Sequence, residues 1–146
     1  MKQPVKRSIT FFLALVILLS ATTTISFARS SWYISSYRAW LSPQTDGIIN
    51  VIIDVAAYDV MDEIGASRVQ IFESKDDGNT WTSKRIYLKS LYPELITTND
   101  FVYYETPISY PGTPGYKYYA EITVYAGDST GSDTKEYTTG VVTAHS

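Results

Sequence analysis

Residues 48–58 read IINVIIDVAAY, and their apolar side chains recur at every second position: Ile49, Val51, Ile53, Val55 and Ala57. Successive side chains of a strand point to opposite faces of a sheet, so this alternation predicts a strand with one buried face. Residues 116–126 (YKYYAEITVYA) repeat the pattern, with Tyr118, Ala120, Ile122 and Val124 on one side. Two half-buried strands of this length favour an antiparallel β structure.

Five further strands are expected, at residues 31–41, 66–74, 81–89, 101–110 and 134–143. Glycine, proline, aspartate and asparagine mark turns between them, at residues 43–47, 75–79 and 111–115. Residues 59–65 and 127–133 are expected to be connections, and residues 90–100 a longer loop or a short helical turn. Pro107 should place its strand at an edge or in a bulge. The pattern predicts a single all-β domain, a seven-stranded antiparallel β-sandwich.

Residues 108–126 resemble the corresponding part of a fibronectin type III or related immunoglobulin-like domain. The corner Pro111-Gly112-Thr113 leads into an alternating central strand, which carries the resemblance. It implies an immunoglobulin/fibronectin III-like sandwich. It also makes Tyr118, or alternatively Tyr116, the candidate corner tyrosine, whose hydroxyl would bond to nearby backbone.

The first 28 residues have the composition of a secretory signal peptide. Lys2, Lys6 and Arg7 precede an apolar run at residues 9–19, and small residues stand at Ser26 and Ala28. That run is well short of the roughly 20 apolar residues that a membrane-spanning helix needs. We expect residues 1–28 to be a signal peptide cleaved after Ala28, and residues 29–146 to be a secreted domain without a stable membrane anchor.

The composition excludes several classes of chemistry. The chain has no cysteine, which excludes disulfides and thiolate metal sites, and one histidine, so that a Ser-His-Asp triad would depend on His145. Loss of residues 1–28 removes three basic and no acidic residues, which lowers the net charge from −3 to −6. This acidic balance argues against nucleic acid as a partner. We expect no catalytic residue, no metal site and no cofactor.

Residues 29–146 also resemble a family of small secreted proteins of unknown function from Gram-positive bacteria. The residues that suggest it are 28–33 (ARSSWY), 61–66 (MDEIGA) and the Pro111-Gly112-Thr113 corner. This resemblance implies export and a β fold, and it implies nothing about activity.

Residues 74–81 (SKDDGNTW) match the Asp-box pattern at Ser74, Asp76, Gly78, Thr80 and Trp81. The physical content of the pattern is a hairpin: glycine permits a tight turn, the carboxylate accepts backbone N–H groups, and the indole packs beneath. A sialidase propeller carries such a motif in several blades, whereas this chain has one copy and scattered arginines. We therefore expect a structural hairpin and no catalytic group.

Three groups of side chains remain as candidates. Asp59, Asp62 and Glu63 would suit calcium or would form a solvated acidic loop. Trp32 and Trp40 share one parity and are expected in the core. Exposed tyrosines would suit sugar rings or a protein partner, although cross-strand pairing that stabilises the sheet is favoured, for Tyr33, Tyr37, Tyr103, Tyr104, Tyr119, Tyr125 and Tyr137.

These observations favour a secreted, non-enzymatic β-sandwich module that binds an extracellular protein or glycan. The sequence leaves its oligomeric state open. One alternative is a small secreted glycan-active hydrolase, which would need two facing carboxylates. Another is a structural or matrix component whose edge strands pair with neighbours.

Overall fold

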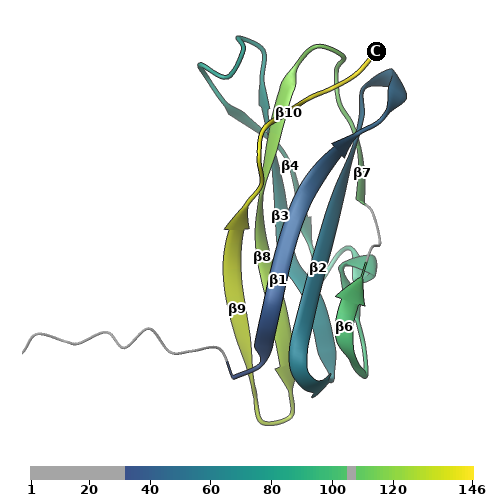
Figure 1. Cartoon of the computed structure of the whole chain (residues 1–146), viewed down its shortest axis with the longest axis vertical. Helices are drawn as coiled ribbons and strands as arrows, with labels where there is room; N and C mark the ends of the chain where they lie inside the picture. The colour runs from purple at the N-terminus through teal and green to yellow at the C-terminus, as the bar shows by residue number, and fades with distance from the viewer. Residues whose placement is uncertain (1–31, 105–107) are drawn as a thin grey trace, which may run out of the picture. The chain divides into compact units, whose positions relative to one another are not determined.

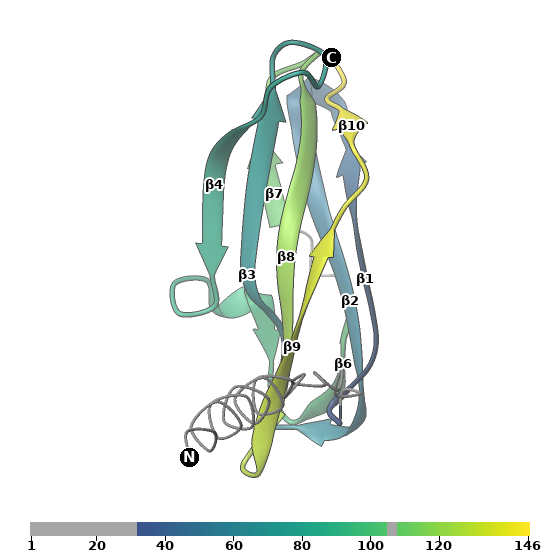
Figure 2. The ribbon, with the colours of Figure 1, turned by 90° about the vertical axis from the view of Figure 1, so that its left-hand side faces the viewer.

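The alternating strands form two antiparallel sheets that pack against each other (Figure 1, Figure 2). The computed structural model describes residues 32–104 and 108–146. Sheet A has four strands: β1 (Ile34–Pro43), β2 (Ile48–Met61), β6 (Asp100–Tyr104) and β7 (Ile108–Pro111). Sheet B has six: β3 (Glu63–Ser74), β4 (Thr82–Leu88), β5 (Ile96–Thr97), β8 (Lys117–Asp128), β9 (Gly131–Thr138) and β10 (Val142–Thr143). Two short 3-10 helices, η1 (Thr45–Gly47) and η2 (Pro93–Leu95), lie in connections, and the described residues contain no α-helix.

Each sheet is built around long central strands. In sheet A, β2 pairs with β1 along one side and with β6 and β7 at different points along its length. In sheet B, β3 and β8 pair over almost their whole length, β4 extends the sheet beyond β3, and β9 extends it beyond β8. Figure 2 shows β4 standing at the outer edge of its sheet. β4 and β7 are therefore edge strands, one in each sheet.

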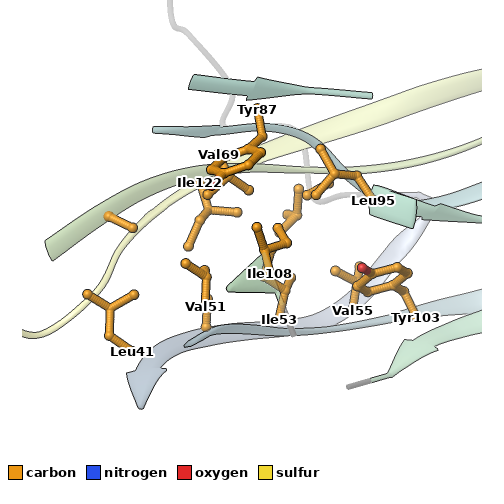
Figure 3. Close-up of a cluster of buried hydrophobic side chains, with 14 of the residues drawn as sticks. Leu41, Val51, Ile53, Val55, Val69, Tyr87, Leu95, Tyr103, Ile108 and Ile122 are labelled. Carbon is orange, nitrogen blue, oxygen red and sulfur yellow. The ribbon is translucent and has the colours of Figure 1, made fainter. Parts of the chain in front are cut away.

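The core lies between the inward faces of the two sheets. Figure 3 shows Val51 and Ile53 of sheet A facing Val69 and Ile122 of sheet B, with Tyr87 above them. All five alternating apolar residues of β2 are at most 9% exposed, which confirms the predicted face of that strand. Burial of each large aliphatic side chain contributes about 1.5–3 kcal/mol, so this single cluster supplies the main stabilisation of the fold.

Residues 32–104 and 108–146 contain ten strands rather than the seven that the sequence predicts for the domain. The expected loop at residues 90–100 contains β5, and the expected strands 101–110 and 134–143 are each divided in two. Pro107, which was expected to disturb the first of these, lies outside the described residues. The all-β class and the antiparallel pairing are confirmed.

Two expected connections are much shorter than their composition suggests. β2 continues to Met61 and β3 begins at Glu63, and Met61 and Ile64 are both buried in the core despite the acidic residues between them. β8 and β9 are joined by a tight turn in which the Asp128 carboxylate accepts the backbone N–H groups of Thr130 and Gly131. Polar residues are tolerated in β9 because its outward side chains face solvent.

The structure overturns the prediction that Trp32 lies in the core. Trp32 precedes β1, in a bend, and is 78% exposed. Within β1, the pairing with β2 shifts between Ile34 and Ser36, which inserts one residue and reverses the side-chain alternation, so that Ile34 and Leu41 both enter the core. Trp40, which the sequence also predicts in the core, is half-buried and points to the outward face of the sheet, away from the side that Leu41 occupies.

Candidate functional site

The outward-facing side chains of β1, β2 and β6 form one continuous surface, which we call the sheet A face. The strand register places Arg38 opposite Asp54, and Asp54 opposite Tyr104. In the next outward row, it places Ala56 of β2 opposite Val102 of β6. The surface consists of Ser36, Arg38, Trp40, Asp54, Ala56, Val102 and Tyr104.

An ion pair crosses this face between β1 and β2. Arg38 Nε donates to Asp54 Oδ2 at 2.6 Å, and the guanidinium carbon lies 5.0 Å from the centre of the Trp40 ring. The Asp54 side chain is 13% exposed, whereas that of Arg38 is 63% exposed. Asp54 Oδ1 is buried and makes no hydrogen bond within residues 32–104 and 108–146. A buried acceptor without a partner costs about 1–3 kcal/mol, so this carboxylate would gain from a new donor.

A groove of about 340 Å³ lies beside the ion pair. Its lining includes Ala56, Val102 and Tyr104, and Arg38 and Asp54 stand in the same lining. Tyr104 is 63% exposed and so presents its ring to solvent. Ligand sites typically have this volume and this mixture of apolar surface with a few polar groups.

The Asp-box residues Ser74, Asp76, Gly78, Thr80 and Trp81 all lie at the hairpin between β3 and β4. Asp76 Oδ1 accepts hydrogen bonds from the Ser74 hydroxyl and the Thr80 backbone N–H, both at 2.8 Å. The Thr80 hydroxyl donates to Asp76 Oδ2 at 2.7 Å, and Gly78 N–H donates to Ser74 Oγ at 2.8 Å. The bonds from Thr80 and Ser74 lower the pKa of Asp76 from 3.8 to about 2. Every polar atom in this network is engaged within the turn itself.

Trp81 of the same motif packs onto the outward face of sheet B. Its ring meets Tyr119 edge-on at 4.7 Å, and Tyr119 in turn stacks on Phe72 at 4.7 Å. Gly78 has a φ of +95°, and a Cβ placed on it would lie 3.6 Å from the indole. The motif thus ties the hairpin to the sheet through aromatic contacts.

Tyr118 lies at the end of the corner formed by residues 111–115. Its ring is fully buried, and its hydroxyl accepts a hydrogen bond from Thr113 N–H at 2.8 Å. The same hydroxyl donates to the buried Glu73 carboxylate at 2.7 Å. Burial raises the pKa of Tyr118 to about 12. Tyr116, the alternative corner residue, is half-buried and contacts the Lys75 ammonium at 5.9 Å.

The other candidate groups are dispersed. Asp59 accepts the N–H of its neighbour Val60, and Glu63 pairs with Lys89. In the part of the chain that the structure describes, no three acidic or histidine side chains gather as a metal site. No helix there is long and apolar enough to cross a membrane.

The tyrosines divide between core, edge contacts and open surface. Tyr103 is buried and its hydroxyl donates to the Glu94 carbonyl, while Tyr37 and Tyr137 meet edge-on at 6.1 Å between β1 and β9. Tyr104 remains open to solvent. Some of these tyrosines therefore pair with another ring, as Tyr37 and Tyr137 do, whereas Tyr104 is exposed.

We compared the chain with protein-family models, with curated proteins and with solved structures, and none of them matched.

Sequence reasoning placed Asp54 on the outward parity of its strand but missed the sheet A face as a site. The face depends on the register between β1, β2 and β6, which are up to 66 positions apart from Arg38 to Tyr104. The one local signal is the spacing of Arg38 and Trp40, which puts a cation and an indole on the same side of one strand.

Proposed function

We propose that this protein is an exported, non-enzymatic module that binds an extracellular glycan through the sheet A face. One observation carries the proposal: an exposed aromatic ring and a carboxylate–guanidinium pair line the same groove of about 340 Å³. Of the two ligand classes that the sequence leaves open, a protein or a glycan, we favour the glycan.

The chemistry of the groove suits a sugar ring. A pyranose has an apolar C–H face that stacks on aromatic side chains, and Tyr104 and Trp40 supply such rings on this face. It also carries several hydroxyl groups that donate and accept hydrogen bonds. Asp54 supplies a carboxylate acceptor, and Arg38 supplies the adjacent donor group.

A protein partner would be expected to need a larger apolar surface. Stable protein interfaces bury about 800 Å² on each partner with a hydrophobic centre. The centre of the sheet A face is instead occupied by the Arg38–Asp54 ion pair. Charged residues are depleted from interface centres, which supports the smaller, hydroxyl-rich ligand.

Two finer features of the protein belong to the same proposal. Export rests on the signal-peptide composition of residues 1–28, which lie outside the described residues. The immunoglobulin/fibronectin III-like arrangement of the sandwich is supported by the contact of Tyr118 with the Thr113 backbone. N-terminal sequencing of protein from the culture medium should give Arg29 first, and a chain that starts at Met1 would contradict export by cleavage.

A glycan array followed by calorimetric titration tests the binding function. Residues 29–146 should retain at least one glycan, and Tyr104→Ala and Trp40→Ala should each weaken its binding about tenfold, which corresponds to about 1.4 kcal/mol. Trp32→Ala is the matched control, because Trp32 is more exposed than either residue and precedes β1, outside the sheet A face. Absence of any retained glycan, or equal effects of the three variants, would contradict the proposal. Retention of a protein alone would assign the face to a protein partner.

A further inference from the structure

A second cavity lies between the two sheets, on the side opposite to the contact of β1 with β9. It has a volume of about 530 Å³ and is lined by β4, η2 and β7. Within the described residues, β4 pairs only with β3 and β7 only with β2, so the two edge strands border this cleft. The side chains that give it chemical character are Arg85, Tyr87, Tyr92, Glu94 and Tyr110.

Arg85 differs from the other cations in its part of the chain. Lys84 lies 3.4 Å from the Glu73 carboxylate, and Lys89 pairs with Glu63. Arg85 has no carboxylate within 4.0 Å among the described residues, although it is the cation that enters the cavity lining. Among the described residues, the guanidinium is thus a positive charge without a carboxylate counter-ion.

Aromatic side chains hold this guanidinium in place. Arg85 Nη2 donates to the Tyr92 hydroxyl at 2.8 Å, and the guanidinium carbon lies 5.5 Å from the centre of the Tyr87 ring. The Tyr87 and Tyr92 rings meet edge-on at 4.9 Å, and Tyr87 is only 7% exposed. The hydrogen bond to Tyr92 raises the pKa of Arg85, so the charge persists at every physiological pH. A fixed, planar guanidinium binds a carboxylate through two parallel hydrogen bonds.

The remaining walls define the rest of the ligand. Tyr110 is buried at 9% exposure and Pro111 is exposed, so the cleft offers apolar surface beside the charge. Glu94 is exposed at the rim and would repel a ligand with several negative charges, while its oxygens accept hydroxyl donors. A sugar acid combines one carboxylate, an apolar ring face and several hydroxyl groups.

We propose that this cleft binds a carboxylate-bearing saccharide, with its carboxylate on Arg85 and its ring against the tyrosines. The site is separate from the sheet A face, and it does not depend on the function proposed for that face.

Calorimetric titration of residues 29–146 at low salt tests the cleft, with aldotriouronic acid, a trisaccharide that carries one carboxylate, as the probe. The acid should bind, and binding should weaken when salt is added because the contact is ionic. The methyl-esterified trisaccharide should bind at least tenfold more weakly. Arg85→Gln should also weaken binding of the acid at least tenfold. Arg85→Lys should weaken it less, because the positive charge remains while the planar pair of N–H donors is lost.

Three controls separate this proposal from its rivals. Arg68→Gln removes a cation of β3 that bonds to Gln70 outside the cleft, and it should leave the affinity unchanged. Trp40→Ala should also leave it unchanged, so failure of the sheet A face and failure of the cleft remain distinguishable. If Arg85→Gln does not fold, Tyr92→Phe serves as the second variant. It removes the hydroxyl that holds the guanidinium and should weaken binding of the acid several-fold.

The proposal is overturned if aldotriouronic acid does not bind, if its ester binds equally well, or if the Arg85 and Tyr92 variants retain full affinity. Tighter binding of the peptide acid acetyl-Ala-Ala-Ala than of the trisaccharide would overturn the saccharide class and assign the cleft to a peptide carboxylate.

Discussion

Replacing Tyr118 by phenylalanine should destabilise the domain by about 3 kcal/mol. The substitution removes only the hydroxyl, which accepts the Thr113 N–H and donates to the Glu73 carboxylate in a fully buried position. A neutral hydrogen bond contributes about 1 kcal/mol and one to a charged group about 1.5–3 kcal/mol. The sum, about 3 kcal/mol, should lower the melting temperature by roughly 10 °C in a domain of this size.

Urea unfolding followed by circular dichroism measures this loss directly. The midpoint should fall while the dependence on urea stays the same, because the surface exposed on unfolding does not change. Tyr119→Phe is the matched control: the neighbouring tyrosine packs between Phe72 and Trp81, and its hydroxyl makes no hydrogen bond within the described residues. Its loss should stay within about 0.5 kcal/mol.

A double-mutant cycle with Glu73→Gln then isolates the Tyr118–Glu73 bond. Residues that share a buried hydrogen bond couple by about 0.5–3 kcal/mol. If Tyr118→Phe costs no more than Tyr119→Phe, the reasoning that this hydroxyl anchors the corner is refuted.

Three further predictions address stability. Burial raises the pKa of Tyr118 from 10.0 to about 12, so the stability that its hydroxyl contributes is intact below pH 10 and is lost as the pH rises to about 12. Urea unfolding across this window should show a fall in stability in the unmodified protein that Tyr118→Phe lacks. The same pH profile in both proteins would contradict this prediction. Gly65→Ala should lower the free energy of unfolding in urea by more than about 2 kcal/mol, because Gly65 has a φ of +148° and a Cβ would overlap the Leu95 carbonyl oxygen. Gly140→Ala is the control and should be nearly neutral, because a Cβ there would have nothing within 4 Å. Equal losses in the two variants would refute the steric argument. Trp81→Ala should cost about 2 kcal/mol by removing the contact with Tyr119 while glycan affinity stays unchanged, and lost binding at full stability would show that the hairpin carries function.

The sequence predicts the fold where local pattern and tertiary burial agree. The alternation of Ile49 to Ala57 required only a strand with one buried face, and β2 has that face. The turn at residues 75–79 could also be predicted, because Asp77-Gly78 adopts positive φ at low cost, and both residues do so.

The errors arise where a single residue changes the geometry. The bulge between Ile34 and Ser36 leaves no mark in the composition, yet it reverses the parity, so that Ile34 and Leu41 are both buried while Trp40 faces outward. The turn at Asp128 resembles a long polar loop in sequence because an edge strand such as β9 needs few apolar residues.

The candidate sites follow from contacts in the folded chain that no recognised local motif marks. Arg38 meets Asp54 across two paired strands, and Arg85 meets Tyr92, seven residues later, beyond the end of β4. The Asp-box, which is the most specific local pattern, engages its polar groups within its own turn.

The central claim, that the sheet A face binds a glycan, is tested most directly by nuclear magnetic resonance. Amide shifts of ¹⁵N-labelled residues 29–146 would be recorded during titration with the glycan that the array retains. The account predicts that the largest changes map to β1, β2 and β6 around Arg38, Asp54 and Tyr104. Changes confined to the hairpin at residues 74–81 or to other strands, with none on this face, would contradict it.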